Sequence, residues 1–320
     1  MKLYLNLLFY KLINYYSYMD KKKILITGCG GMVGSSMYPV MVEEGYEVLA
    51  TDKDVNEDWL EYLDVRDLDS VKNKVLEFKP DIIIHLAALT SLEYCEDNLE
   101  DSYKTNYLAT RNLAELANKL DISLVYTSTA GTFDGKGDKY LEESYQNPIN
   151  VYGKTKLYGE LAVLHITKKH FVLRPGWMFG GGKKDKKFIS YILKQVSEGA
   201  TELNVVNDKF GTPTYTYDLS KTVAKLLSTE KYGVYNAACK GETNRVEMTK
   251  EILKIINRED IKINEVDSDF FKSDFSVPRA QSEILVDKNL DKENLNEMRN
   301  WRGALEHYLK KEWSHLINNQ

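Results

Sequence analysis

The chain has 320 residues, of which 43 are Lys or Arg and 48 are Asp or Glu, so its formal net charge is −5. Apolar residues make up 43% and charged residues 28%, which is ordinary globular usage and excludes a wholly disordered chain. A mildly acidic balance without a basic stripe argues against nucleic acid as a partner. Three cysteines (Cys29, Cys95 and Cys239) cannot build a disulfide framework and fit no zinc spacing. We therefore expect no metal site and a reduced, cytoplasmic compartment.

Residues 1–20 differ from the rest of the chain, because leucine and aromatic residues recur among them. No run without a charge among them is longer than residues 3–10, which is far shorter than the roughly 20 residues that cross a bilayer. The sequence therefore predicts no membrane span. We interpret the segment as an extension, non-native or disordered, with an interfacial anchor as the alternative.

From residue 21 onward, short apolar runs rich in β-branched residues alternate with helical patterns. The expected strands are residues 24–27, 46–51, 81–88, 122–127 and 171–174, and the expected helices include 69–78 and 108–120. Continuous apolar strands separated by helices predict a parallel sheet covered on both faces, the doubly wound α/β (Rossmann) architecture, for residues 21–175. Residues 176–320 are less regular and predict a smaller α/β substrate lobe. A strand at 233–237 is expected to return to the first sheet.

A glycine-rich turn follows the first expected strand and opens a helix. It contains Gly28, Gly31, Met32, Val33 and Gly34. Such a turn lets backbone N–H groups approach a pyrophosphate at a helix N-terminus. Asp52 ends the second expected strand, where a carboxylate accepts hydrogen bonds from ribose hydroxyls and repels a 2′-phosphate. This arrangement favours NAD(H), while the adjacent Lys53 leaves NADP(H) possible.

Tyr152 and Lys156 stand four residues apart in a helix that is expected to begin near Asn150. At this spacing both side chains leave one helix face. An ammonium beside a phenol is expected to lower the pKa of the phenol, which makes Tyr152 a usable acid near neutral pH. The pair is common by itself, but it becomes specific together with the glycine-rich turn and with Ser128 and Thr129 after the fifth strand. By contrast, His85 in an apolar strand is expected to be a buried core residue.

The order of these motifs resembles the extended short-chain dehydrogenase/reductases, over about residues 21–310. Later stretches are similar to the dTDP-4-dehydrorhamnose reductase branch, namely FDG at 133–135, PINVYGKTKL at 148–157, DKFGTPTYT at 208–216 and WRGAL at 301–305. The resemblance implies an NAD(P)H-dependent oxidoreductase that reduces the 4-keto group of a nucleotide-activated deoxysugar for polysaccharide precursors. It also implies a homodimer.

Carried over by position, the resemblance implies a role for each matching residue. Tyr152 would protonate the ketone oxygen, Lys156 would hold the nicotinamide ribose, and Thr129 would hydrogen-bond the same carbonyl. The further cofactor contacts implied are Asp64 and Val65 at the adenine, Leu86, Ala87 and Ala88 after the fourth strand, Asn106 in support of the lysine, and Thr127. The further substrate contacts implied are Thr90, Trp177 and Arg279, of which Arg279 would contact a phosphate.

One departure from the branch concerns the substrate. The branch usually has Asp and then Tyr after the catalytic Thr, where this chain has Ala130 and Gly131. Neither residue can transfer a proton, which argues against a 4,6-dehydratase and against an epimerase of the fucose-synthase type. Two alternatives to the reductase stay open. One is a nucleotide-sugar 4-epimerase with tightly bound NAD, and the other is a non-catalytic regulatory subunit like the β-subunit of methionine adenosyltransferase.

Overall fold

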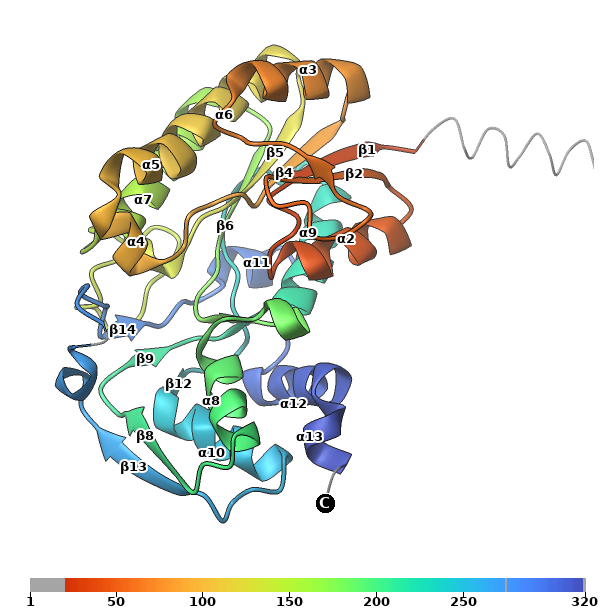
Figure 1. Ribbon diagram of the computed structural model, residues 1–320. Helices are drawn as coiled ribbons and strands as arrows, with labels where there is room; N and C mark the ends of the chain where they lie inside the picture. The colour runs from red at the N-terminus through yellow and green to blue at the C-terminus, as the bar shows by residue number, and fades with distance from the viewer. Residues whose placement is uncertain (1–20, 274, 319–320) are drawn as a thin grey trace, which may run out of the picture.

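The computed structural model describes residues 21–273 and 275–318, so the expected extension at 1–20 lies outside the described residues. Seven strands form one parallel sheet in the order β11-β6-β5-β4-β1-β2-β3 (Figure 1). Their bounds are β1 Lys23–Thr27, β2 Glu47–Asp52, β3 Glu61–Tyr62, β4 Ile82–His85, β5 Ser123–Thr127, β6 His170–Arg174 and β11 Gly233–Asn236. The strand order reverses between β1 and β4, which is the switch point of a doubly wound fold. The predicted fold class is confirmed.

Helices cover both faces of this sheet (Figure 1). One face carries α3 Leu68–Phe78, α6 Ala109–Lys119 and α7 Val151–Ile166, and the other carries α2 Gly34–Glu43 and α9 Thr216–Leu227. Successive side chains of β1 enter opposite cores, because side chains alternate along a strand. Ile24 and Ile26 pack in the core of α2 and α9, and Leu25 packs in that of α3 and α6. Three shorter helical segments run beside α7, namely α4 Leu92–Asp97, α5 Leu99–Tyr103 and the π-helical turn η1 Lys104–Leu108.

A second lobe lies below the carboxyl edge of the sheet (Figure 1). Its strands are β7 Met178–Phe179, β8 Glu202–Val206, β9 Phe210–Gly211, β10 Thr214–Tyr215, β12 Thr243–Asn244, β13 Lys262–Val266 and β14 Ser282–Glu283. Its helices are α8 Phe188–Ser197, α10 Arg245–Ile255, α12 Trp301–Glu312 and α13 Ser314–Asn318, while α11 Lys288–Lys292 packs beside β11. Single 3₁₀ turns are η2 Ala130–Thr132, η3 Gly182–Lys184 and η4 Ser268–Phe271. In the described ranges, none of the helices has both the length and the apolar character needed to cross a bilayer.

Most expected strands agree with the structure to within one residue, but the one expected at 81–88 ends at His85. The apolar residues after it turn away from the sheet and pass under the glycine-rich turn. A Cβ atom placed on Gly28 would lie 2.4 Å from the Cα atom of Ala87. The apolar run thus continues past the strand because the residues after His85 pack against the glycine-rich turn. Beyond residue 175 the chain also returns to the first sheet, through α9 and the edge strand β11.

Candidate active site

The glycine-rich turn joins β1 to α2 at the carboxyl edge of the sheet. Gly28 has a φ of +71°, and a Cβ on Gly34 would lie 2.0 Å from the carbonyl oxygen of Cys29, so both positions need glycine. A Cβ on Gly31 would meet only the carbonyl oxygen of Gly28, at 3.6 Å, and this side of the turn is therefore open. Met32 and Val33 are half-buried beside it. Within the described part of the chain no side chain caps α2, so its first N–H groups suit a pyrophosphate.

Asp52 lies beside this turn at the end of β2. Its Oδ2 accepts a hydrogen bond of 2.9 Å from the N–H of Gly30, and its Oδ1 accepts one of 3.0 Å from the N–H of Asp54. These two donors hold the carboxylate in place, and its remaining lone pairs suit ribose hydroxyls. The neighbouring Lys53 is exposed.

The residues expected at the adenine lie after β3. Val65 is buried, and Asp64 accepts hydrogen bonds from the guanidinium of Arg66, the shortest at 2.6 Å. These bonds hold the pKa of Asp64 below its ordinary value. The Asp64 side chain is therefore positioned by Arg66.

Asn106 lies in the π-helical turn and is fully buried. Its Oδ1 accepts a bond of 2.8 Å from the N–H of Leu89, and its Nδ2 donates to the carbonyl oxygen of Leu89 and to Oγ1 of Thr155. It thereby ties the loop after β4 to α7, one residue from Lys156. Single π-helical turns of this kind are frequent at functional sites. The same loop holds the half-buried residues 86–88 and the exposed Thr90.

Tyr152 and Lys156 occupy the first two turns of α7. The helix begins as expected, because Oδ1 of Asn150 accepts a hydrogen bond of 2.8 Å from the N–H of Gly153. Thr129, which follows β5, lies beside Tyr152: a Cβ placed on Gly131 would lie 3.4 Å from Oγ1 of Thr129 and 3.6 Å from Cε1 of Tyr152. The structure thus brings together the three side chains that sequence patterns single out as catalytic candidates.

Burial dominates the pKa values of this pair. It raises the pKa of Tyr152 to about 12 and lowers that of Lys156 to about 7. The expectation of a lowered pKa for Tyr152 is therefore wrong, because both groups lose water and the burial that disfavours each charged form dominates. A protonated Tyr152 near neutral pH still suits the role of an acid.

His85 is confirmed as a buried core residue. Its Nδ1 lies 2.7 Å from Oγ1 of Thr27, and its Nε2 lies 3.0 Å from Oγ1 of Thr110. Burial lowers its pKa to about 3, so the ring is neutral. At the end of β5, Oγ1 of Thr127 is buried and finds no hydrogen-bond partner among the described residues, as fits a group that contacts a ligand.

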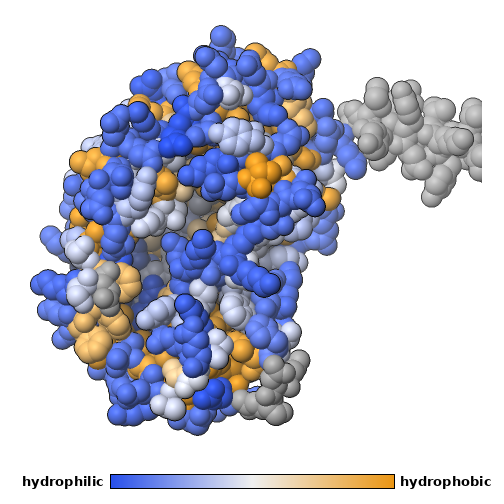
Figure 2. Space-filling model, in the orientation of Figure 1, coloured by the Kyte–Doolittle hydropathy of each residue, from blue (hydrophilic) through white to orange (hydrophobic). Residues whose placement is uncertain are grey.

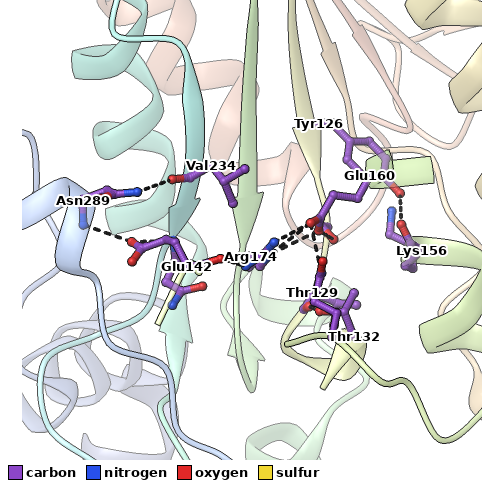
Figure 3. Close-up of polar contacts among 12 residues, drawn as sticks. Tyr126, Thr129, Thr132, Glu142, Lys156, Glu160, Arg174, Val234 and Asn289 are labelled. Atoms are coloured by element: carbon purple, nitrogen blue, oxygen red, sulfur yellow. Dashed lines mark hydrogen bonds and ion pairs between the residues drawn. The ribbon is translucent and has the colours of Figure 1, made fainter. Parts of the chain in front are cut away.

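A buried ion pair, which the sequence analysis missed, lies one helical turn beyond Lys156 (Figure 3). Glu160 accepts a hydrogen bond of 2.5 Å from Arg174, one of 2.6 Å from the Ser128 hydroxyl and one of 3.0 Å from Gln146. Arg174 also donates to the carbonyl oxygen of Glu142. The network joins α7 to the ends of β5 and β6. No local pattern could reveal it, since its members come from separate elements.

The second lobe forms the side of the edge where the sequence analysis expects the substrate, and the surface is hollowed between the lobes (Figure 2). The indole N–H of Trp177 donates a bond of 2.7 Å to Glu283, and the guanidinium of Arg245 lies 3.6 Å from the centre of the Trp177 ring. Arg279, the expected phosphate contact, is paired at 2.7 Å with Glu93 of α4. Arg245 and Glu283 belong to no recognised motif, and the sequence analysis missed both.

The parallel strand order, the glycine-rich turn at its switch point and the Thr–Tyr–Lys group define a Rossmann-type α/β protein. Comparison with family models then identifies the particular family. Residues 22–313 match the RmlD substrate binding domain, and the chain belongs to this family. The resemblance inferred from the sequence motifs is confirmed.

Individual relatives agree with this assignment. The chain is 30% identical over 288 residues to the spore coat polysaccharide biosynthesis protein SpsK of Bacillus subtilis (strain 168), with 90% of this chain and 96% of that protein covered. It is 32% identical to the methionine adenosyltransferase 2 subunit beta of Xenopus tropicalis, covering 71% and 70%. The structure of dTDP-4-dehydrorhamnose reductase from Bacillus anthracis in complex with NADP is similar with a TM-score of 0.83, at 29% identity, covering 91% and 100%.

Proposed function

We propose that this chain is an NAD(P)H-dependent oxidoreductase of the short-chain dehydrogenase/reductase type. It would reduce the 4-keto group of a nucleotide-activated deoxysugar to an alcohol in the supply of polysaccharide precursors. The observation that carries the proposal is the close approach of Thr129 to Tyr152 beside the buried Lys156, at the edge that holds the glycine-rich turn. The similarity to an NADP-bound reductase and to a polysaccharide biosynthesis protein supports it.

The chain's own residues fit a dinucleotide. The open side of the turn at Gly31 and the uncapped start of α2 would receive the pyrophosphate, and Asp52 would receive the ribose hydroxyls. The unpartnered hydroxyl of Thr127 and the buried Lys156 would lie on the nicotinamide side. Once bound, the reduced nicotinamide supplies the hydride.

Each member of the Thr–Tyr–Lys group would then have one task. Tyr152 gives its hydroxyl proton to the ketone oxygen as that oxygen becomes negative. A pKa of about 12 keeps the proton on Tyr152 until the oxygen becomes basic enough to take it. Thr129 donates a hydrogen bond to the same oxygen. The ammonium of Lys156 stabilises the Tyr152 phenolate until solvent returns a proton.

The testing experiment follows the absorbance of NADH and NADPH with the purified protein and a panel of nucleotide-4-keto-6-deoxysugars. We expect turnover with at least one sugar and a loss of about 10²- to 10⁴-fold for Tyr152→Phe. Binding of NADPH, measured by its fluorescence, should be unchanged in this variant. Retention of most of the wild-type rate by Tyr152→Phe would contradict the proposal.

A regulatory subunit is the second candidate, and the similarity to methionine adenosyltransferase 2 subunit beta supports it. Co-purification with a partner enzyme, without turnover of any keto-sugar, would favour this candidate. The 4-epimerase alternative predicts conversion of a nucleotide sugar without added reductant, so stoichiometric consumption of NADH or NADPH argues against it. The preference for NAD(H), the homodimer and the cytoplasmic location stay predictions.

A further inference from the structure

Arg245 differs from every other arginine of the chain in its ionic contacts. The sequence has eight arginines, and seven of them pair with a carboxylate: Arg66, Arg111, Arg174, Arg258, Arg279, Arg299 and Arg302. Among residues 21–273 and 275–318, no carboxylate lies within ion-pair distance of Arg245, and no side chain or carbonyl accepts a hydrogen bond from its guanidinium. Glu283 attracts this charge only from beyond ion-pair distance, so the hydrogen-bond donors of the guanidinium are available to a ligand.

The guanidinium of Arg245 is nevertheless held in one position. It lies 3.6 Å from the centre of the Trp177 ring and 4.5 Å from that of Phe188, so two aromatic rings support it. Trp177 is itself fixed by its bond to Glu283. A Cβ on Gly211 would lie 2.5 Å from Cε2 of Trp177, so glycine is needed there for the indole to pack on β9. A cation positioned in advance binds an anion with little loss of conformational entropy.

This cation lies on the substrate side of the catalytic edge. Trp177 comes three residues after β6, and β6 neighbours β5, whose end leads to Thr129. The N–H of Ala130 also donates a bond of 2.8 Å to the carbonyl oxygen of Pro175. Burial is the main cause of the raised pKa of Tyr152, and the charge of Glu283 raises it further, so the group around Trp177 lies within electrostatic range of the proton donor.

Two other cations act on Glu283, but their donors are engaged. Arg279 pairs with Glu93 and donates to the carbonyl oxygen of Val277, while Lys209 donates a bond of 3.1 Å to the carbonyl oxygen of Arg279. Both nevertheless add positive potential. Burial raises the pKa of Glu283, and the charges of Arg245, Lys209 and Arg279 partly oppose this increase. A doubly charged anion beside Arg245 would therefore meet a positive field and one free guanidinium.

We propose that Arg245 binds the diphosphate bridge of the nucleotide-sugar substrate, with Trp177 and Phe188 as the platform that orients its guanidinium. This inference rests on the proposed function and names the residue that would recognise the substrate's charge. Arg279, which the sequence resemblance suggests for phosphate contact, stays paired with Glu93 and shapes the cleft.

Isothermal titration calorimetry on the full chain tests the proposal. UDP, GDP, CDP and dTDP are each titrated into the wild type, and the tightest of them is compared with its nucleoside. Arg245→Gln should weaken binding of the diphosphate by about 10- to 100-fold and leave nucleoside binding nearly unchanged. Arg245→Lys keeps the charge but lacks the planar guanidinium, so its affinity for the diphosphate should lie between those of the wild type and Arg245→Gln. Arg258→Gln, which alters an exposed ion pair of the same lobe, should bind like the wild type.

Three results would overturn the proposal, and thermal unfolding of each variant first checks that it is folded. Wild-type affinity of Arg245→Gln for the diphosphate, with a loss in Arg279→Gln, would assign the phosphate to Arg279 and leave the proposed function standing. An equal loss of nucleoside and diphosphate binding would show that Arg245 does not act through the phosphates. Failure of the wild type to bind any of the four diphosphates would contradict the proposed function as well.

Discussion

The ammonium nitrogen of Lys156 lies 4.2 Å from the centre of the Tyr126 ring, and the Tyr126 hydroxyl donates a hydrogen bond of 3.1 Å to the carbonyl oxygen of Lys156. A single tyrosine of β5 thus contacts both ends of the proposed catalytic lysine. The contact requires a close approach of α7 to the sheet. A Cβ on Gly159 would lie 2.5 Å from the Tyr126 hydroxyl oxygen, so only glycine permits that approach. Tyr126 is therefore a positioning residue for Lys156.

Two substitutions at Tyr126 distinguish the role of its ring from the role of its hydroxyl. Tyr126→Leu removes the aromatic face that stabilises the buried ammonium, so the pKa of Lys156 should fall below about 7. The alkaline loss of kcat/KM should then move to lower pH. Tyr126→Phe keeps the ring and should keep the wild-type pH profile, at a cost of about 1 kcal/mol of stability for the lost hydrogen bond. Identical profiles for the two variants would contradict the role of the ring.

The burial of Lys156 predicts a pH-dependent cost in stability. Its folded-state pKa of about 7 lies below the ordinary value of 10.5, so between these values the unfolded chain binds more protons and stability rises with pH. Lys156→Met should therefore increase the free energy of unfolding by about 1–3 kcal/mol at pH 6. The gain should shrink toward pH 10. Urea unfolding at both pH values measures this, with the exposed Lys194→Met as the control. A wild type that is the more stable protein at pH 6 would refute the prediction.

The ion pair of Glu160 and Arg174 is fully buried, so removal of one partner leaves the other charge buried and unpaired. Glu160→Gln should lower the free energy of unfolding by about 3–5 kcal/mol, and replacing both residues by apolar ones should recover much of this. The charge of Glu160 also raises the pKa of Lys156. The alkaline limb of activity should therefore move to lower pH in Glu160→Gln. Equal stability of the single and double variants would show that the pair is not coupled.

Two helical glycines are expected to respond in opposite ways to alanine. At Gly153 in α7, a Cβ would lie 2.2 Å from the carbonyl oxygen of Gly131, so the first turn of the helix must shift. Because Tyr152 lies in that turn, Gly153→Ala should lower kcat and cost about 1–3 kcal/mol. At Gly303 in α12, nothing lies within 4 Å of the added Cβ, and Gly303→Ala should stabilise by about 0.5–1 kcal/mol. Calorimetric unfolding and initial rates compare the two, and similar behaviour would count against the packing argument.

Asp52 should control the choice of dinucleotide. Its carboxylate would repel a 2′-phosphate, so Asp52→Asn should raise the ratio of kcat/KM for NADPH over NADH by about tenfold. Lys53→Met, which removes the neighbouring positive charge, should move the ratio the other way. Initial rates with both dinucleotides measure the ratio. An unchanged ratio in Asp52→Asn would show that other residues discriminate between NADH and NADPH.

Contacts that are local in sequence were predictable. The apolar runs of β1, β2, β5 and β6 agree with the structure to within a residue, and α7 begins at the Asn150 cap as expected. The approach of Thr129 to Tyr152 follows because Thr129 comes after the carboxyl end of β5 and the next long helix, α7, begins at that same edge. The pKa of Tyr152 was not predictable, because it depends on how much water the second lobe and the packed helices exclude.

The order of apolar runs, glycines and caps along the chain was sufficient for the Rossmann class, the glycine-rich turn and the Tyr–Lys pair, because each depends on residues within a few turns or one strand of each other. The substrate side depended on the tertiary structure. Trp177 and Glu283 are 106 residues apart, and Arg245 meets Trp177 only because β12 pairs with β9. Short-range periodicity does not predict pairings between distant segments. The free charge of Arg245 and the buried pair of Glu160 with Arg174 could therefore be identified only in the folded chain.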